Sequence, residues 1–299
     1  MIDLTKLATE QRNPATMNLD TFTPLQIAES MNREDQHAVE AVRAVLPQVA
    51  TAISWAADAL SCGGRIIYLG AGTSGRLGVL DAVECPPTFG VSYDTVVGLI
   101  AGGDHAFVKA EEGAEDRAEG GEEDLRAHSL VKDDLVIGLA ASGRTPYVLG
   151  GLRYASSVGS RTVAIACNRG SEIGAVADLA IEPATGPEVL SGSTRLKAGT
   201  AQKLILNMIS TGAMTGIGKV YENLMVDVKQ SNEKLVTRAQ NIVMEACGCS
   251  REQAEKALGS AGGSVKLAIV MLLLGCSAEE AESALSKAHG HVRQAVGRA

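Results

Sequence analysis

Short apolar runs alternate with helical segments through the middle of this 299-residue chain, and this alternation restricts the fold more than any other feature. The pattern predicts strands near residues 65–70, 95–100, 134–140, 161–167 and 178–182, and helices at 74–85, 104–119 and 146–158. Strands that alternate with helices form parallel sheets whose two faces are covered by those helices. We therefore predict an α/β domain of the flavodoxin-like type, closed by a long helix at about 196–216.

The two ends of the chain differ from this middle part. Residues 1–35 are polar and lack periodicity, which predicts an arm that becomes ordered only by packing, whereas residues 37–62 have one long helical periodicity. Near the other end, residues 249–258 are echoed by 276–285 at an offset of 27, which indicates a duplicated helical unit with Ser250 and Ser277 as N-caps. We predict an N-terminal arm at 1–36, a catalytic α/β domain at 37–237 and a small all-helical domain at 238–299.

Composition limits the possible partners and cofactors. The chain is 45% hydrophobic but 3% aromatic, so its core must consist of Ala, Val, Leu and Ile, and the net charge of −8 disfavours nucleic acid and anionic membranes as partners. We find no signal-like segment and no apolar run of membrane-spanning length, and we expect a cytoplasmic protein. The six cysteines and five histidines show no metal-binding spacing, so we expect buried thiols, no metal and no cofactor.

Hydroxyl-rich glycine turns follow two of the predicted strands. Such turns, at the carboxyl edge of a parallel sheet, present backbone N–H groups to anionic oxygens. A third hydroxyl cluster precedes the long helix. We predict that a phosphorylated small molecule is held by Gly72, Thr73, Ser74, Gly75, Ser142, Gly143, Arg144, Thr145, Ser193, Arg195 and Lys197. Within this set, Ser142, Thr145 and Ser74 should bind the phosphate together with the N–H groups of Gly75 and Gly143.

The glycine turns also fit roles that involve no phosphosugar, but they fit them less well. Ser142 and Thr145 could simply cap the helix that begins at Pro146. The segment from Gly70 to Gly75 matches the dinucleotide fingerprint, but the required acidic residue is missing: Asp94, the nearest candidate, precedes its strand instead of ending it. The chain lacks the Gly-Lys-Ser/Thr ending of a P-loop.

Among the carboxylates, Glu84 is unusual because it follows an apolar helical run that we expect Pro86 and Pro87 to stop. A second, crowded group of acidic residues lies between 111 and 123, and most of them fit a solvated helix face. Spacing alone does not single out one of that group.

The segment from Leu69 to Gly90 resembles the signature of the N-acetylmuramic acid (MurNAc) 6-phosphate etherases, a family with a sugar isomerase (SIS) domain. The resemblance continues through Thr9–Asn13, Gly98–Gly103, Glu112–Asp116, Ala140–Tyr147, Gly192–Lys203, Asn223–Val228 and Asn232–Lys234. It implies a flavodoxin-like SIS domain followed by a small helical domain that resembles ubiquitin-associated modules. It also implies a phosphorylated amino sugar as substrate and a homodimer, since SIS domains commonly complete their sites across a subunit contact.

The resemblance implies cleavage of the lactyl ether of MurNAc 6-phosphate to N-acetylglucosamine (GlcNAc) 6-phosphate and D-lactate, within cell-wall amino sugar metabolism. Glu84 is then the acid that acts on the ether oxygen, and Glu115 is the second acid/base group. Because Glu84 must begin protonated, we expect it to be buried in an apolar corner.

Two other functions use the same features. One is an aldose–ketose isomerase of sugar phosphates, which also needs a base at C2. The other is a non-catalytic sensor that binds a phosphosugar and regulates a partner.

Overall fold

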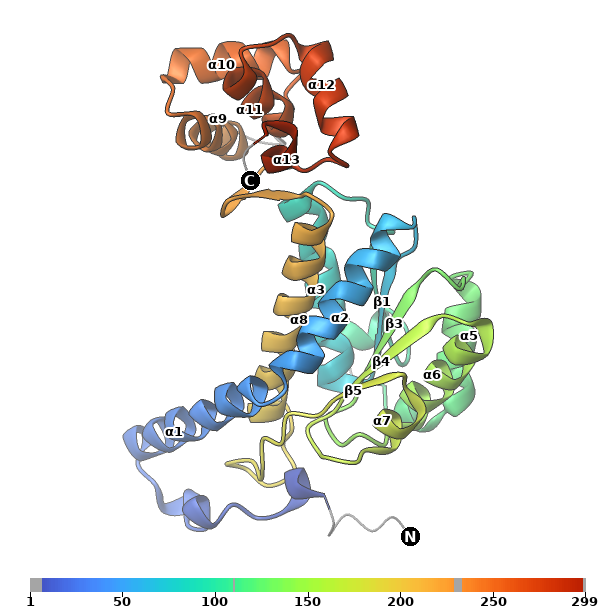
Figure 1. The fold of residues 1–299 in the computed structure, drawn as a ribbon. Coiled ribbons are helices and arrows are strands. Elements are labelled where there is room, and N and C mark those ends of the chain that lie inside the picture. The colour runs from blue at the N-terminus through green and yellow to red at the C-terminus, as the bar shows by residue number, and fades with distance from the viewer. Residues whose placement is uncertain (1–6, 110, 229–232, 298–299) are drawn as a thin grey trace. The chain divides into compact units, whose positions relative to one another are not determined.

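The computed structural model describes residues 7–109, 111–228 and 233–297, and the chain forms two compact units (Figure 1). The first unit comprises Met1–Val83 and Asp94–Ser210, and the second comprises Glu84–Tyr93 and Thr211–Ala299. Asn232, part of one segment that resembles the etherases, lies outside the described residues. The domain limits expected above remain a prediction.

The first unit is built on a five-stranded parallel sheet in the order β2-β1-β3-β4-β5, which confirms the predicted α/β fold. The strands are β1 (Ile66–Gly70), β2 (Val96–Ile100), β3 (Leu135–Leu139), β4 (Arg161–Ile165) and β5 (Leu179–Ile181). Every residue of β1 and β3 is buried, as expected for central strands covered on both faces. Strand β2 pairs with one edge of β1, and β3 pairs with the opposite edge. The direction in which strands are added to the sheet therefore reverses between β1 and β3.

Helices cover both faces of this sheet (Figure 1). One face carries α5 (Ala118–Ala127), α6 (Pro146–Val158) and α7 (Glu172–Val176), and the other carries α2 (Leu46–Ser61) with α3 (Gly72–Phe89) and α8 (Lys197–Gly216). A buried polar bridge joins the second set to the sheet: the Tyr68 hydroxyl of β1 donates to Asp81 of α3 at 2.8 Å, and Ser210 of α8 donates to the same carboxylate at 3.0 Å. The core consists mainly of Ala, Val, Leu and Ile, as composition predicted.

The structure corrects the helix predicted over residues 37–62. Two helices stand in its place, α1 (Pro24–Arg43) and α2, and they are separated near Pro47, which lies in the first turn of α2. Helix α1 begins thirteen residues earlier than expected because Thr23 and Gln26 form a capping box and Pro24 occupies its first turn. Before α1, the described residues form the short 3₁₀ turns η1 (Ala8–Glu10), η2 (Pro14–Thr16) and η3 (Leu19–Thr21).

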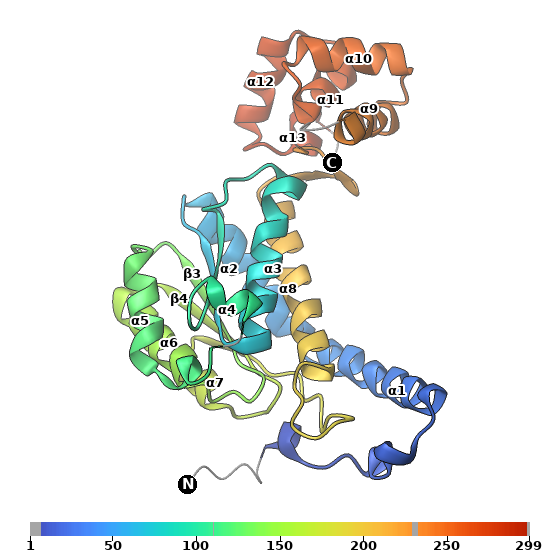
Figure 2. The same cartoon turned by 180° about the vertical axis from the view of Figure 1, so that it is seen from behind.

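The helix predicted over residues 104–119 is also wrong. That stretch holds α4 (His105–Val108) and the 3₁₀ turn η4 (Ala114–Asp116), and α5 begins at Ala118. Gly113 adopts a φ of +78°, a left-handed conformation that a helix interior does not allow. Figure 2 shows α4 beside α3.

Pro86 and Pro87 do not stop α3, which continues to Phe89. Both prolines lie in its final turns, where the Thr88 hydroxyl donates to the Glu84 carbonyl oxygen at 2.8 Å and the Gly90 N–H donates to the Pro86 carbonyl oxygen at 3.0 Å. Gly90, with a φ of +69°, then ends the helix.

The second unit contains the hairpin β6 (Val220–Tyr221) and β7 (Leu224–Met225), followed by α9 (Glu233–Cys247), α10 (Arg251–Ser260), α11 (Val265–Leu274), α12 (Ala278–Lys287) and α13 (Val292–Ala295). The duplication is confirmed in its geometry, because Ser250 and Ser277 both form capping boxes at the starts of α10 and α12. Among the described residues no single helix has the length and hydropathy of a membrane span, although α10 and α11 together reach them across a bend of 112°.

The predicted burial of the cysteines holds only in part. Cys85 and Cys167 are buried, three others are half-buried, and Cys62 is exposed, so the prediction is wrong for Cys62.

Candidate functional site

The turn after β1 begins the candidate site at the reversal point of the sheet order. Gly72 has a φ of +53° and starts α3, so the first-turn N–H groups at Thr73 and Ser74 have no acceptor within the helix. The Ser74 side chain is buried, and its hydroxyl donates to Gln202 Oε1 of α8 at 2.9 Å. The Gln202 Nε2 atom is buried and makes no hydrogen bond in the described chain.

The turn after β3 supplies the second loop of the site. Thr145 occupies the N-cap position of α6, yet its side chain makes no capping hydrogen bond, and the Ser142 hydroxyl accepts only a long bond of 3.4 Å from the Arg144 N–H. Thr145 is partly exposed, and within the described ranges neither hydroxyl has a strong bond that a ligand would have to break. The Arg144 side chain instead donates to Glu172 at 2.8 Å.

Gly75 and Gly143 do not offer the N–H groups that we expected to bind phosphate. The Gly75 N–H donates to the Ala71 carbonyl oxygen at 3.1 Å, and the Gly143 N–H donates to the Ala140 carbonyl oxygen at 2.9 Å. Gly143 is needed for its backbone instead, because it has a φ of +78° and a Cβ there would overlap Ser171.

The start of α8 is the third segment of the site, and its charged groups divide into two kinds. Arg195 is exposed and Ser193 is half-buried, so both remain open to a ligand. The Lys197 ammonium, in contrast, is buried and pairs with Glu34 of α1 at 2.5 Å. Glu188 is fully buried and accepts the first-turn N–H groups of Lys197 and Ala198, each at 3.0 Å.

Two carboxylates beside Lys197 have displaced pKa values. Burial raises the pKa of Glu188, and its bonds to the α8 amides offset this only in part. Burial also acts to raise the pKa of Glu34, but the hydrogen bond and charge of Lys197 outweigh it, so this pKa lies below its usual range. Lys197 therefore belongs to a buried ionic cluster that fixes α1 against α8.

The N-terminal arm packs directly on these loops. The buried Asn168 amide donates to Thr9 Oγ1 at 2.9 Å and to the carbonyl oxygens of Ala141 and Ser142 at 3.2 and 3.4 Å. The Thr16 hydroxyl donates to the Val189 carbonyl oxygen at 2.8 Å. These contacts connect the described part of the arm to the loop that carries Ser142.

Glu115 lies on η4 and lines a cavity of about 410 Å³. Gly72 and Arg76, from the start of α3, line the same cavity, as do Glu111 and Glu112. The structure therefore brings Glu115 together with the glycine turn after β1, as expected if both act on one ligand. Arg76 was not predicted as a site residue: it follows the glycine turn directly, but no spacing rule distinguishes it.

Glu84 lies on α3 in the second unit, and its side chain is exposed. The expectation that it is buried in an apolar corner is wrong for the chain by itself, because α3 continues past it and leaves Val83 and Glu84 on an open face. Twelve residues separate it from Gly72 on the same helix, which at 1.5 Å per residue is about 18 Å along the axis.

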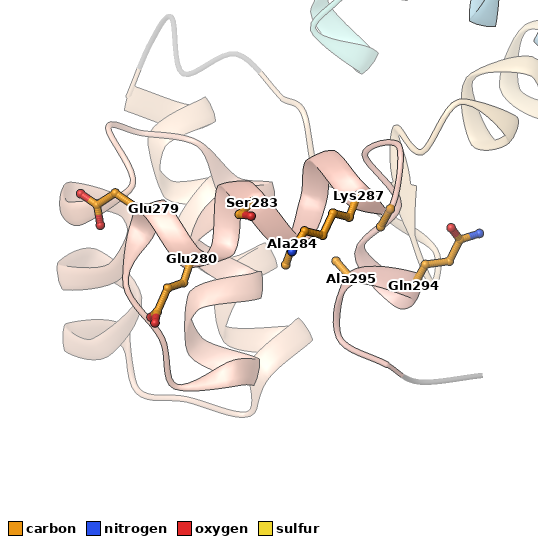
Figure 3. Close-up of a pocket in the computed structure, with 8 residues that line it drawn as sticks. Glu279, Glu280, Ser283, Ala284, Lys287, Gln294 and Ala295 are labelled. Carbon is orange, nitrogen blue, oxygen red and sulfur yellow. The ribbon is translucent and has the colours of Figure 1, made fainter.

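A larger cavity, about 690 Å³, lies between α12 and α13 (Figure 3). It is lined by alanines and by Glu279, Glu280, Lys287 and Gln294, and Glu280 accepts the Ser277 N–H within the capping box of α12. None of the predicted site residues lies there, and the mixed charges of its wall do not favour an anionic ligand.

Comparison with known proteins adds a family relationship. The SIS domain family matches residues 118–211, the N-terminal SIS domain of glucokinase regulatory protein matches 48–156, and the C-terminal lid domain of glucokinase regulatory protein matches 222–262. The N-acetylmuramic acid 6-phosphate etherase of Serratia proteamaculans is 60% identical over 269 residues, which cover 90% of this chain and 91% of that protein. The protein of the same name from Salmonella agona is 59% identical with the same coverage. Among solved structures, a phosphoheptose isomerase from Francisella tularensis is 16% identical, with a TM-score of 0.49 over 65% of this chain and all of that one.

Proposed function

The chain belongs to the N-acetylmuramic acid 6-phosphate etherases, and from this premise we propose how its residues break the ether bond. Its activity is that of a carbon–oxygen lyase, and the isomerase and sensor functions that the sequence left open are set aside by the relatives at about 60% identity. The observation that carries the catalytic proposal is the cavity shared by Glu115 and the glycine turn after β1.

We assign the 6-phosphate of the substrate to the loops after β1 and β3. In the described part of the chain neither Ser142 nor Thr145 has a strong hydrogen-bond partner for its hydroxyl, and the first-turn N–H groups of α3 at Thr73 and Ser74 have no acceptor within the helix. Ser193 and Arg195 are open to the same ligand. Arg144 and Lys197 are instead paired with carboxylates, so we assign them to holding the site's loops in place rather than to binding the phosphate. Binding of the phosphate supplies energy remote from the reacting carbons, which positions them against the carboxylates.

The reaction is an elimination followed by addition of water. Opening of the sugar ring exposes the C1 aldehyde, which acidifies the proton on C2. Glu115 removes this proton, the bond between C3 and the ether oxygen breaks, and Glu84 protonates that oxygen as D-lactate leaves. Water then adds to C3 of the unsaturated aldehyde while Glu84 accepts its proton, and Glu115 returns a proton to C2.

Glu84 must reach the cavity of Glu115 for this scheme to work. Since it is exposed and about 18 Å along α3 from the start of the helix, we infer that a homodimer brings the Glu84 of the partner subunit to the Glu115 site.

Mixed dimers test this arrangement. Glu84→Ala and Glu115→Ala chains are each expected to be inactive alone, and a mixture refolded together should recover activity because one of the two sites in a mixed dimer is then intact. If the mixture stays inactive while gel filtration shows mixed dimers, each site takes both glutamates from one chain.

The catalytic roles are tested by separating the half-reactions. With GlcNAc 6-phosphate in heavy water, Glu84→Ala should still exchange the C2 proton, and Glu115→Ala should not, because only the C2 base is needed. Loss of exchange in Glu84→Ala and its retention in Glu115→Ala would reverse the roles. The physiological setting that fits this activity is cytoplasmic recycling of cell-wall amino sugars.

A further inference from the structure

Among the described residues that line the Glu115 cavity, Arg76 carries the basic side chain. Its guanidinium is fixed by two bonds to the backbone around α4: Nε donates to the Phe107 carbonyl oxygen and Nη2 to the Ala106 carbonyl oxygen, each at 2.8 Å. A guanidinium has five N–H donors, so three remain for another acceptor. The two backbone bonds hold the group in one orientation before any ligand binds.

The remaining charges of the cavity are negative. Glu111, Glu112 and Glu115 line it with Arg76, and none of them lies within ion-pair distance of Arg76 in the described part of the chain. Three carboxylates repel an anionic ligand, and an unpaired cation in their midst offsets that repulsion. If the substrate carries a second anionic group besides the phosphate, and this group enters the cavity, it must therefore bind at Arg76.

We propose that Arg76 binds the carboxylate of the lactyl group and thereby selects the lactyl ether over other hexosamine 6-phosphates. The proposal rests on the assignment of Glu115 to C2, because the ether is attached to C3, the neighbouring carbon, and its lactyl carboxylate then lies in the same cavity. The free N–H groups of a fixed guanidinium suit the two oxygens of a carboxylate. The product sugar has no such carboxylate, so Arg76 does not contribute to its binding.

A purely structural role for Arg76 predicts something different. If it only anchors α4, its loss should weaken all ligands of the site equally and lower the free energy of unfolding. A pair of ligands that differ by the lactyl group separates the two roles.

The test measures dissociation constants of MurNAc 6-phosphate and GlcNAc 6-phosphate by calorimetry, in a Glu84→Ala background that blocks turnover. Arg76→Gln should weaken MurNAc 6-phosphate roughly 10- to 150-fold and GlcNAc 6-phosphate by less than about twofold, since a hydrogen bond between charged groups is lost only with the first. Arg153→Gln, an exposed arginine on α6, is the matched control and should change neither. Equal weakening of both ligands, or no change in either, overturns the proposal.

Failure of the catalytic assignment would be visible separately. If Glu84→Ala still releases lactate, Glu84 is not the acid. The effect of Arg76→Gln is then measured instead on the KM for MurNAc 6-phosphate in the enzyme that retains Glu84. Arg76→Lys should recover part of the affinity for MurNAc 6-phosphate, because the charge is kept while the fork geometry is lost.

Discussion

Asn168 is predicted to couple the N-terminal arm to the phosphate loop, and Asn168→Ala tests this coupling. The amide is buried, donates to Thr9 Oγ1 at 2.9 Å and to the Ala141 carbonyl oxygen at 3.2 Å, and accepts the Thr9 N–H at 3.4 Å. Two good bonds and two long ones, the second long one to the Ser142 carbonyl oxygen at 3.4 Å, are removed, and buried Thr9 groups are left without these partners. At about 1 kcal/mol for each bond, plus the cost of unsatisfied buried groups, the expected loss of unfolding free energy is about 2–4 kcal/mol.

The assay is urea unfolding of Asn168→Ala beside the control Asn207→Ala, whose side chain lies exposed on α8 and accepts a bond from Lys203. The control should change stability by less than about 0.5 kcal/mol. Since the Asn168 amide also contacts the Ser142 carbonyl oxygen, affinity for GlcNAc 6-phosphate should fall in Asn168→Ala and not in the control. Unchanged stability and affinity in Asn168→Ala would refute the coupling.

Three further predictions concern the site and the helical unit. Ser142→Ala should weaken GlcNAc 6-phosphate roughly 10-fold or more in calorimetry and leave urea unfolding unchanged, because its hydroxyl has only a 3.4 Å partner; lost stability with unchanged affinity would instead show a capping role. Burial raises the pKa of Glu188, so the wild type should lose stability relative to Glu188→Gln as pH rises from about 4.3 through that raised pKa. A gain in wild-type stability relative to Glu188→Gln over this pH range would contradict this prediction. Deletion of 238–299 should change the mass in solution or the KM for MurNAc 6-phosphate, and a truncated protein with neither change would exclude a role in assembly or in completing the site.

The strands and the phosphate loops could be predicted because their signals are local. Apolar runs such as Ile66–Leu69 end in glycines, and a buried parallel strand needs little else. The capping box of Thr23 and Gln26 was also readable, but α1 buries only a thin stripe of Ser30, Glu34, Ala38 and Val42, so its apolar periodicity is weak.

The remaining features depend on contacts that sequence spacing does not encode. Lys197 was expected to bind phosphate, but its ammonium forms an ion pair with Glu34, which lies 163 residues away in the sequence. Helix α3 passes through Pro86 and Pro87 to Phe89, although each proline removes one N–H donor from the helix. The position of Arg76 in the Glu115 cavity follows from the packing of α4 on α3, which no local pattern indicates.

Turnover of MurNAc 6-phosphate in water enriched in heavy oxygen tests the central claim, elimination across C2 and C3 by Glu115 and Glu84, most directly. Elimination breaks the bond between C3 and the ether oxygen, so lactate keeps its original oxygen and the solvent label must appear at C3 of GlcNAc 6-phosphate. Mass spectrometry of the two products decides the outcome. Label in the sugar and none in lactate is the predicted result, and label in lactate would mean cleavage on the other side of the ether and would contradict the mechanism.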